Sequence, residues 1–195
     1  MIYLITNKRE EFNLPPEIEF AEVEDCLKYF KNEEEVEVDT ETEGFDCYTC
    51  KVLSLQLGDN KNQYVVDTLT VDITLFKEIL ESKLILLQNA KFDLQFLYYN
   101  GIFPTNVYDT FLAECVLHMG KMNVRKGLDV LVEKYCQIVV DKSLQANIHK
   151  EGLSNRGIIY AATDVKYLGE IKKKQIENLK AQNIIISEQM RKQAS

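Results

Sequence analysis

Apolar residues are spaced along the chain in a way that predicts short strands alternating with amphipathic helices. Short apolar runs bounded by Gly, Asn or Asp are typical of strands, whereas apolar positions that recur every three or four residues indicate helices. Strands are expected at 2–5, 36–40, 52–57, 63–67, 84–87 and 107–108. Helices are expected at 21–30, 72–81, 91–99, 110–117, 127–135 and 155–180.

The order of these elements predicts an α/β fold, with a mixed sheet flanked by helices. The strands at 36–40, 52–57 and 63–67 are joined by short, turn-prone segments, so they are expected to be antiparallel neighbours. The later strand–helix–strand order predicts a crossover connection. Without an internal repeat or a Pro/Gly/Ser-rich linker, the chain is expected to form one compact unit. We divide it into an N-terminal strand and helix (1–35), a main domain (36–180) and a C-terminal tail (181–195).

Composition narrows the setting of this domain. The chain has 195 residues, of which 46% are hydrophobic, enough to fill one sizeable core. We find no apolar run long enough to span a bilayer and no export signal, so we expect no membrane partner. The five cysteines are an odd number, which favours free thiols and a reducing, cytoplasmic location over a disulfide framework.

The formal charge of −8 argues against a protein that coats nucleic acid by neutralising its phosphates. This objection does not apply to a site in which carboxylates gather divalent cations, because the cations then supply positive charge where a phosphate lies.

Three short segments carry acids in positions that suit such a site. Asp39 and Glu41 are two residues apart on a strand, so both carboxylates point to the same face. Asp93 lies in the first turn of a helix, where the helix dipole alone would also favour an acid. Tyr160 and Asp164 are four residues apart on a helix and share one face, although a tyrosine on an apolar stripe is usually part of a packed core.

In this order, Asp39-Thr40-Glu41-Thr42, Asn89 with Asp93, and Tyr160 with Asp164 resemble the three motifs of the DnaQ-like 3′→5′ exonucleases, in the tyrosine-containing DEDD branch. Gln88-Asn89-Ala90-Lys91-Phe92-Asp93 is most similar to the proofreading domain of bacterial and phage family A DNA polymerases, whereas 141–145 resembles RNase D and Werner-type exonucleases. The resemblance covers about 36–175. It implies an RNase H-like fold with a five-stranded mixed sheet, and 36–180 as the exonuclease domain.

The resemblance also implies two Mg²⁺ or Mn²⁺ ions, held by Asp39, Glu41, Asp93 and Asp164, with Asp39 bridging both ions. Carboxylate oxygens are the ligands that these hard cations prefer. Tyr160 is expected to orient the attacking water, because a phenol with a pKa near 10 is a poor base. A catalytic histidine would have to stand at Ile159, so the histidine branch is excluded.

Substrate contacts are expected from Thr40, Phe45, Gln88, Asn89 and Lys142. Phe45 occupies the position of an apolar wedge in family A exonucleases, although it could instead be a buried loop anchor. Asn89 could instead cap the end of a strand, and Lys142 could instead be a solvated surface lysine. Asp109 is interpreted as a helix cap, and the pair Cys47 and Cys50 as ordinary loop sequence, since zinc would need two further ligands.

We therefore expect an exonuclease that releases nucleoside monophosphates from the 3′ end of DNA, preferably single-stranded, in proofreading, replication or repair. It would work in a bacterial or phage-infected cell, alone or with a DNA polymerase region or subunit. Two alternatives remain open: an RNase D-like enzyme that trims RNA, and a structural module without activity.

Overall fold

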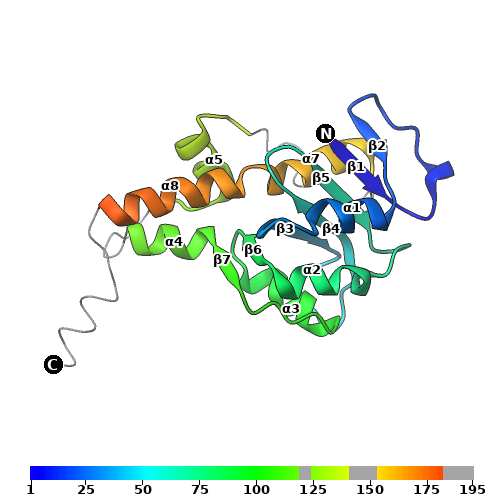
Figure 1. Cartoon of the computed structure of the whole chain (residues 1–195), viewed down its shortest axis with the longest axis horizontal. Coiled ribbons are helices and arrows are strands. Elements are labelled where there is room, and N and C mark those ends of the chain that lie inside the picture. The colour runs from blue at the N-terminus through cyan, green and yellow to red at the C-terminus, as the bar shows by residue number, and fades with distance from the viewer. Residues whose placement is uncertain (119–123, 141–152, 182–195) are drawn as a thin grey trace.

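The computed structural model describes residues 1–118, 124–140 and 153–181, and its centre is one mixed, seven-stranded sheet (Figure 1). The sheet order is β2-β1-β5-β4-β3-β6-β7. Its strands are β1 (Ile2–Ile5), β2 (Ile18–Phe20), β3 (Glu35–Thr42), β4 (Val52–Gly58), β5 (Gln63–Asp67), β6 (Leu84–Leu87) and β7 (Val107–Asp109).

The expected pairing of the central strands is confirmed. β3, β4 and β5 are antiparallel neighbours, and β6 and β7 continue the sheet in parallel on the other side of β3. The expected number of five strands is wrong, because β1 and β2 add two parallel strands beyond β5. β2 is only three residues long, too short for an alternating pattern to reveal it. The first 35 residues therefore contribute to the same sheet as the rest of the chain.

Helices cover both faces of the sheet. They are α1 (Val23–Phe30), α2 (Lys77–Ser82), α3 (Lys91–Tyr99), α4 (Thr110–Leu117), α5 (Leu128–Cys136), α7 (Asn155–Lys166) and α8 (Leu168–Ala181), with 3₁₀ turns at Arg9–Glu11 and Ile73–Phe76. The main core contains Phe30 of α1, Phe96 of α3 and Phe76, which ends the 3₁₀ turn before α2. A second core joins α7 to the opposite face, where Ile158 and Ala161 pack with residues of β1 and β5.

The single helix expected at 155–180 is in fact two helices, α7 and α8, separated at Tyr167. At this break the buried Glu37 of β3 accepts a hydrogen bond of 2.7 Å from the backbone N–H of Gly169. A Cβ atom at position 169 would lie 2.4 Å from the Glu37 Oε1 atom, so any other residue there would require the end of the Glu37 side chain to move. α7 thus stays on the sheet, while α8 extends away from it beside α4 and α5 (Figure 1).

The tail at 182–195 lies outside the described residues, and α8 ends at Ala181. Within the described part of the chain, no helix has both the length and the apolar character needed to cross a bilayer.

Candidate active site

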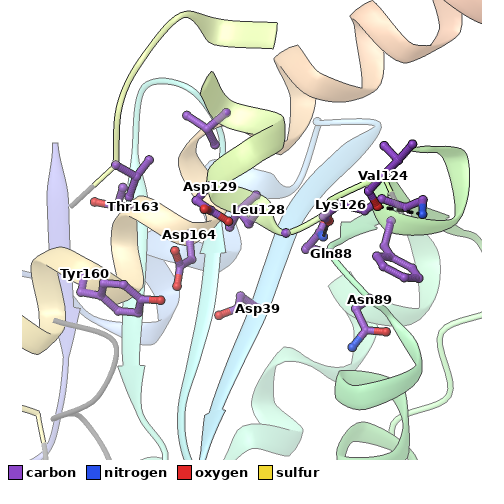
Figure 2. A pocket seen from close by; sticks show the side chains of 14 residues that line it. Asp39, Gln88, Asn89, Val124, Lys126, Leu128, Asp129, Tyr160, Thr163 and Asp164 are labelled. Atoms are coloured by element: carbon purple, nitrogen blue, oxygen red, sulfur yellow. Dashed lines mark hydrogen bonds between the residues drawn. The ribbon is translucent and has the colours of Figure 1, made fainter. Parts of the chain in front are cut away.

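The acidic site is built where β3 passes under α7. Asp39 and Glu41 lie on β3, and Asp164 comes from α7, which packs against β3, β4 and β5. One carboxylate oxygen from each of these three acids lies within 4.8 Å of the others, so the group could hold a metal ion. All three are partly exposed to a cavity rather than sealed in the core. Figure 2 shows Tyr160 and Asp164 extending from α7 toward Asp39.

Asp93 lies beside this group but is not one of the three acids that could share an ion in this way. It is 2% exposed, in the first turn of α3, and its Oδ1 atom accepts hydrogen bonds from the backbone N–H of Thr40 at 3.0 Å and the Thr40 hydroxyl at 2.7 Å. These bonds fix the carboxylate of α3 to the strand that carries Asp39 and Glu41. Thr40, which we expected at the substrate, is buried and directs its hydroxyl to Asp93.

Tyr160 is both packed and part of the site. Its side chain is 8% exposed, and its hydroxyl lies near the carboxylate of Asp164, one helical turn further along α7 (Figure 2). Burial raises the pKa of the phenol above its ordinary value, and the nearby charge of Asp164 raises it further. The phenol therefore stays protonated at any ordinary pH and acts as a hydrogen-bond donor.

The carboxylates of the site hold protons unusually well when only the protein surrounds them. Burial raises the pKa of Glu41 to about 7, with a further contribution from the charge of Asp93. Burial likewise raises the pKa of Asp164 and of Asp93 to about 7, against the lowering effect of the bonds from Tyr160 and Thr40. The pKa of Asp39 is raised well above its ordinary value by burial and then by Asp93, Asp164 and Glu41. Such mutual repulsion favours a divalent cation at the centre.

Asn89 stands at the end of β6 in a left-handed backbone conformation, with φ of 61°, which asparagine adopts more readily than most residues. Asp109 holds this turn, since its carboxylate accepts bonds of 3.0 Å from the N–H groups of Asn89 and Ala90. It also caps α4 by accepting from the N–H of Phe111 at 2.8 Å, so its interpretation as a helix cap is confirmed. No motif indicated that Asp109 also holds the turn at Asn89.

Gln88, an expected substrate contact, lines the larger cavity described below, and both ends of its amide are bonded within the protein. Its Oε1 atom accepts from the Thr110 hydroxyl at 2.5 Å, and its Nε2 donates to the backbone oxygen of Lys126 at 2.9 Å. Lys126 is a residue that the motifs did not indicate. It lines the same cavity as Asp39 and Tyr160, together with Asp129 and Thr163.

Two cavities meet at Asn89. The larger, of about 650 Å³, contains Asp39, Tyr160 and Asp164 and extends to Lys126 and the beginning of α5 (Figure 2). The smaller, of about 460 Å³, is lined by Thr40, Glu41, Thr42, Glu43, Gly44, Phe45, Asn89 and Phe92.

Phe45 stands at the rim of the smaller cavity. Its side chain is 87% exposed, so the alternative of a buried loop anchor is wrong. The ring meets Phe92 edge-on, with 6.1 Å between ring centroids and 72° between ring planes. An exposed ring held in this way offers a face on which a base can stack.

Lys142 and His149 lie outside the described residues. His118 contacts Glu114 on α4 and does not line either cavity. Cys47 and Cys50 are free thiols, as are Cys26, Cys115 and Cys136, so the expectation of free thiols is confirmed.

Comparison with known proteins places this geometry in a family. A family model described as a 3′-5′ exonuclease matches residues 19–180. DNA polymerase I of Aquifex aeolicus (strain VF5) is 32% identical over 148 residues, which make up 75% of this chain and 24% of that protein. The chain therefore spans about a quarter of the length of this relative.

Solved structures agree with the match. Escherichia coli RNase D, an exoribonuclease involved in structured RNA processing, has a TM-score of 0.72 at 25% identity, and the match covers 84% of this chain and 44% of RNase D. Brucella melitensis NrnC with bound Mg²⁺ has a TM-score of 0.67 at 18% identity, covering 95% of this chain and 84% of NrnC, and supports the fold. The chain belongs to the 3′-5′ exonuclease family, in the form found in family A DNA polymerases.

Proposed function

We propose that the protein is an active, metal-dependent 3′→5′ exonuclease that removes nucleoside monophosphates from single-stranded or frayed DNA ends. The observation that carries this proposal is the meeting of Asp39, Glu41 and Asp164, whose ligand oxygens lie within 4.8 Å of one another, with the Tyr160 hydroxyl near Asp164. A purely structural module would have no use for a cluster of mutually repelling carboxylates at the edge of an open cavity.

The donor set fits Mg²⁺ or Mn²⁺. It consists of carboxylates, the oxygen ligands that these cations prefer, and no histidine or cysteine lines the larger cavity among the described residues. Asp39 would hold both ions, Glu41 and Asp164 would complete one site, and Asp93 would serve the other. When bound, the pair of ions lowers the pKa of the attacking water and neutralises charge on the leaving 3′ oxygen.

The chain's own groups keep the reacting parts in place. Thr40 holds Asp93 against β3 through two hydrogen bonds, so the carboxylates of β3 and α3 keep a fixed relative position. Tyr160 keeps its proton because of its raised pKa, so it is not the base. It orients Asp164 and the attacking water by donating a hydrogen bond from its hydroxyl.

The residues that line the two cavities support one direction for the bound strand. Beyond the scissile phosphate, the 3′-terminal nucleoside carries no further phosphate, whereas every upstream nucleotide carries one. None of the described residues that line the smaller cavity is basic, and two of them, Glu41 and Glu43, are acidic. This cavity therefore suits the terminal nucleoside, with its base against Phe45 and Phe92. The upstream strand occupies the larger cavity.

DNA is favoured as substrate by the 32% identity to a DNA polymerase I. The second candidate is trimming of RNA 3′ ends, which is favoured by the likeness to RNase D. The deciding experiment compares initial rates on single-stranded DNA, a mismatched primer end and RNA of the same sequence, with a blocked 3′ end as control. Faster removal from DNA, and from mismatched over matched ends, supports the proposal. A clear preference for RNA would replace it with the second candidate.

The chain would act beside a DNA polymerase region or subunit, because its polymerase relative is about four times as long as the matched segment. We also propose a cytoplasmic location in a bacterial or phage-infected cell. The five free thiols are consistent with a reducing compartment.

A further inference from the structure

The larger cavity is strongly one-sided in charge. Three of its lining residues are acids, Asp39, Asp129 and Asp164, and Lys126 is the only basic residue among the described residues that line it. Lys126 immediately precedes α5 and lies across the cavity from Tyr160, with Asp39 between them (Figure 2). A strand that enters this cavity brings a negative charge with each upstream phosphate, and the acids repel it.

Lys126 is held in place by a chain of hydrogen bonds from the sheet. Its backbone oxygen accepts from Gln88 Nε2 at 2.9 Å, and Gln88 Oε1 accepts from Thr110, which is fully buried at the start of α4. Gln88 therefore ties the beginning of α5 to the end of β6. The next two motif residues along the chain are Asn89, at the same end of β6, and Asp93, in the first turn of α3.

The ammonium group of Lys126 is also oriented. Its Nζ donates to the backbone oxygen of Val124 at 3.1 Å, which uses one of the three N–H groups of an ammonium. A lysine held at its base and at its tip loses less side-chain entropy when it contacts a phosphate than a lysine in solvent does.

We propose that Lys126 binds a phosphate of the upstream strand, one of the first two on the 5′ side of the scissile phosphate, and that Gln88 positions it. This inference rests on the proposed exonuclease activity and on the strand direction given above. Gln88 is a positioning residue, because it acts through Lys126 and not by touching the substrate. Lys126 thus supplies a positive charge in a cavity whose other charged residues, among those described, are acids.

The test removes the positive charge of Lys126 and, separately, the negative charge of a phosphate. Lys126→Met is expected to lower kcat/KM on a short single strand by about 10-fold at low salt, mainly through KM, whereas Lys126→Arg keeps most of it. The slope of log kcat/KM against log salt should become shallower by about 0.7 for the lost phosphate contact. Lys28→Met on α1, an exposed lysine outside both catalytic cavities, is the charge-matched control and should change neither quantity.

Substrates with a single neutral methylphosphonate linkage identify the phosphate. The kcat/KM of the wild-type enzyme should fall by about 10-fold when one of the first two upstream linkages is neutral. The kcat/KM of Lys126→Met should not fall further at that linkage. If the two losses multiply at every linkage, Lys126 does not contact a phosphate and the proposal is overturned. A wild-type protein inactive on every strand would instead sink the exonuclease function itself.

Gln88→Met tests the positioning role, because methionine has a similar length but makes no amide hydrogen bond. Its loss of kcat/KM should resemble that of Lys126→Met, and the double variant should be no worse than Lys126→Met alone. Losses that multiply in the double variant would mean that Gln88 contacts the substrate independently, contrary to the proposal.

Discussion

The carboxylates at two places in this molecule, the Glu114 cluster on α4 and the acid group on β3 and α7, have the same side-chain chemistry but opposite surroundings. On α4, Glu114 is 1% exposed and fully surrounded by partners. Its carboxylate accepts from Lys134 at 2.6 Å, from the Tyr135 hydroxyl at 2.7 Å and from Gln175 at 3.1 Å. Burial raises its pKa, but these bonds outweigh burial, so the pKa lies below its ordinary value. This acid joins α4, α5 and α8.

At the catalytic end of β3 the balance is reversed. Asp39, Glu41 and Asp164 face one another, and no cation from the described residues forms an ion pair with them. Their pKa values are raised by burial and by like charge. Where the chain supplies the partners, a buried carboxylate stabilises the fold. Where the chain supplies no such partners, a bound cation must supply the positive charge, and this requirement defines the active site.

The largest expected effect comes from removing one acid from each group. Asp39→Asn should lower the rate of nucleotide release by at least about 1000-fold, since Asp39 is the acid that would hold both ions in the proposed mechanism. Its melting temperature without metal should equal or exceed that of the wild type at pH 8, because one repelling charge is gone. Melting curves and release of labelled mononucleotide measure the two quantities.

Glu114→Gln is the matched change in the other group. It should lower the free energy of unfolding by about 2 kcal/mol, since Lys134 keeps its charge without a partner, while the folded enzyme keeps most of its rate. If Glu114→Gln lost activity without losing stability, or Asp39→Asn the reverse, the distinction between the two groups would be wrong.

Tyr160→Phe comes next in size. It removes the hydroxyl that lies near Asp164 but keeps the buried ring. We expect kcat to fall by about 10- to 100-fold, the range of a hydrogen bond to a charged group, with little change in KM. Single-turnover rates at saturating Mg²⁺ measure the chemical step. A full rate for this variant would remove Tyr160 from the mechanism.

The two groups should also respond to pH with opposite sign. Glu41, Asp93 and Asp164 have folded-state pKa values of about 7, above their ordinary values near 4. Their contribution to stability is therefore present below about pH 4 and is lost as pH rises toward about 7 in metal-free protein. Glu114, with a lowered pKa, contributes stability above its ordinary pKa and loses it in acid.

Melting temperatures from pH 4 to 8, with Mg²⁺ or with a chelator, separate these effects. Mg²⁺ should raise the melting temperature most at pH 8, and Asp39→Asn should flatten the decline in the chelated protein. A wild-type stability that rises steadily to pH 8 without metal would contradict the account of the catalytic acids.

The smallest effect concerns the acids of the smaller cavity. Glu43 lines it, and its carboxylate also accepts from the backbone N–H of Lys51. A strand ending in a 3′-phosphate should be a poorer substrate than one ending in a hydroxyl, and Glu43→Gln should reduce that difference by about 3-fold, the scale of an exposed charge interaction. Equal discrimination in both proteins would place the terminal nucleoside elsewhere.

Local patterns predicted the regular elements well. β1, β5, β6, α3 and α4 have the bounds that their apolar patterns indicate. The break between α7 and α8 was not predictable, because it depends on Glu37 meeting Gly169, 132 residues away. The short strand β2 was missed for lack of a pattern.

The site, too, was predictable from the sequence only in part. The spacing of Asp39 with Glu41, and of Tyr160 with Asp164, sets which side chains share a face, and the fold brings these faces together. The bond from Thr40 to Asp93 and the partners of Gln88 depend on tertiary packing, so the sequence could not show that these two expected substrate contacts also fix other residues. No motif pointed to Lys126 for the same reason.

The most direct test follows a 5′-labelled single strand incubated with Mg²⁺ and wild-type protein or Asp39→Asn. The proposed function predicts a ladder that shortens by one nucleotide at a time from the 3′ end, absent with a chelator and absent in the variant. Cleavage at internal positions, shortening from the 5′ end, or an unchanged ladder in Asp39→Asn would contradict it.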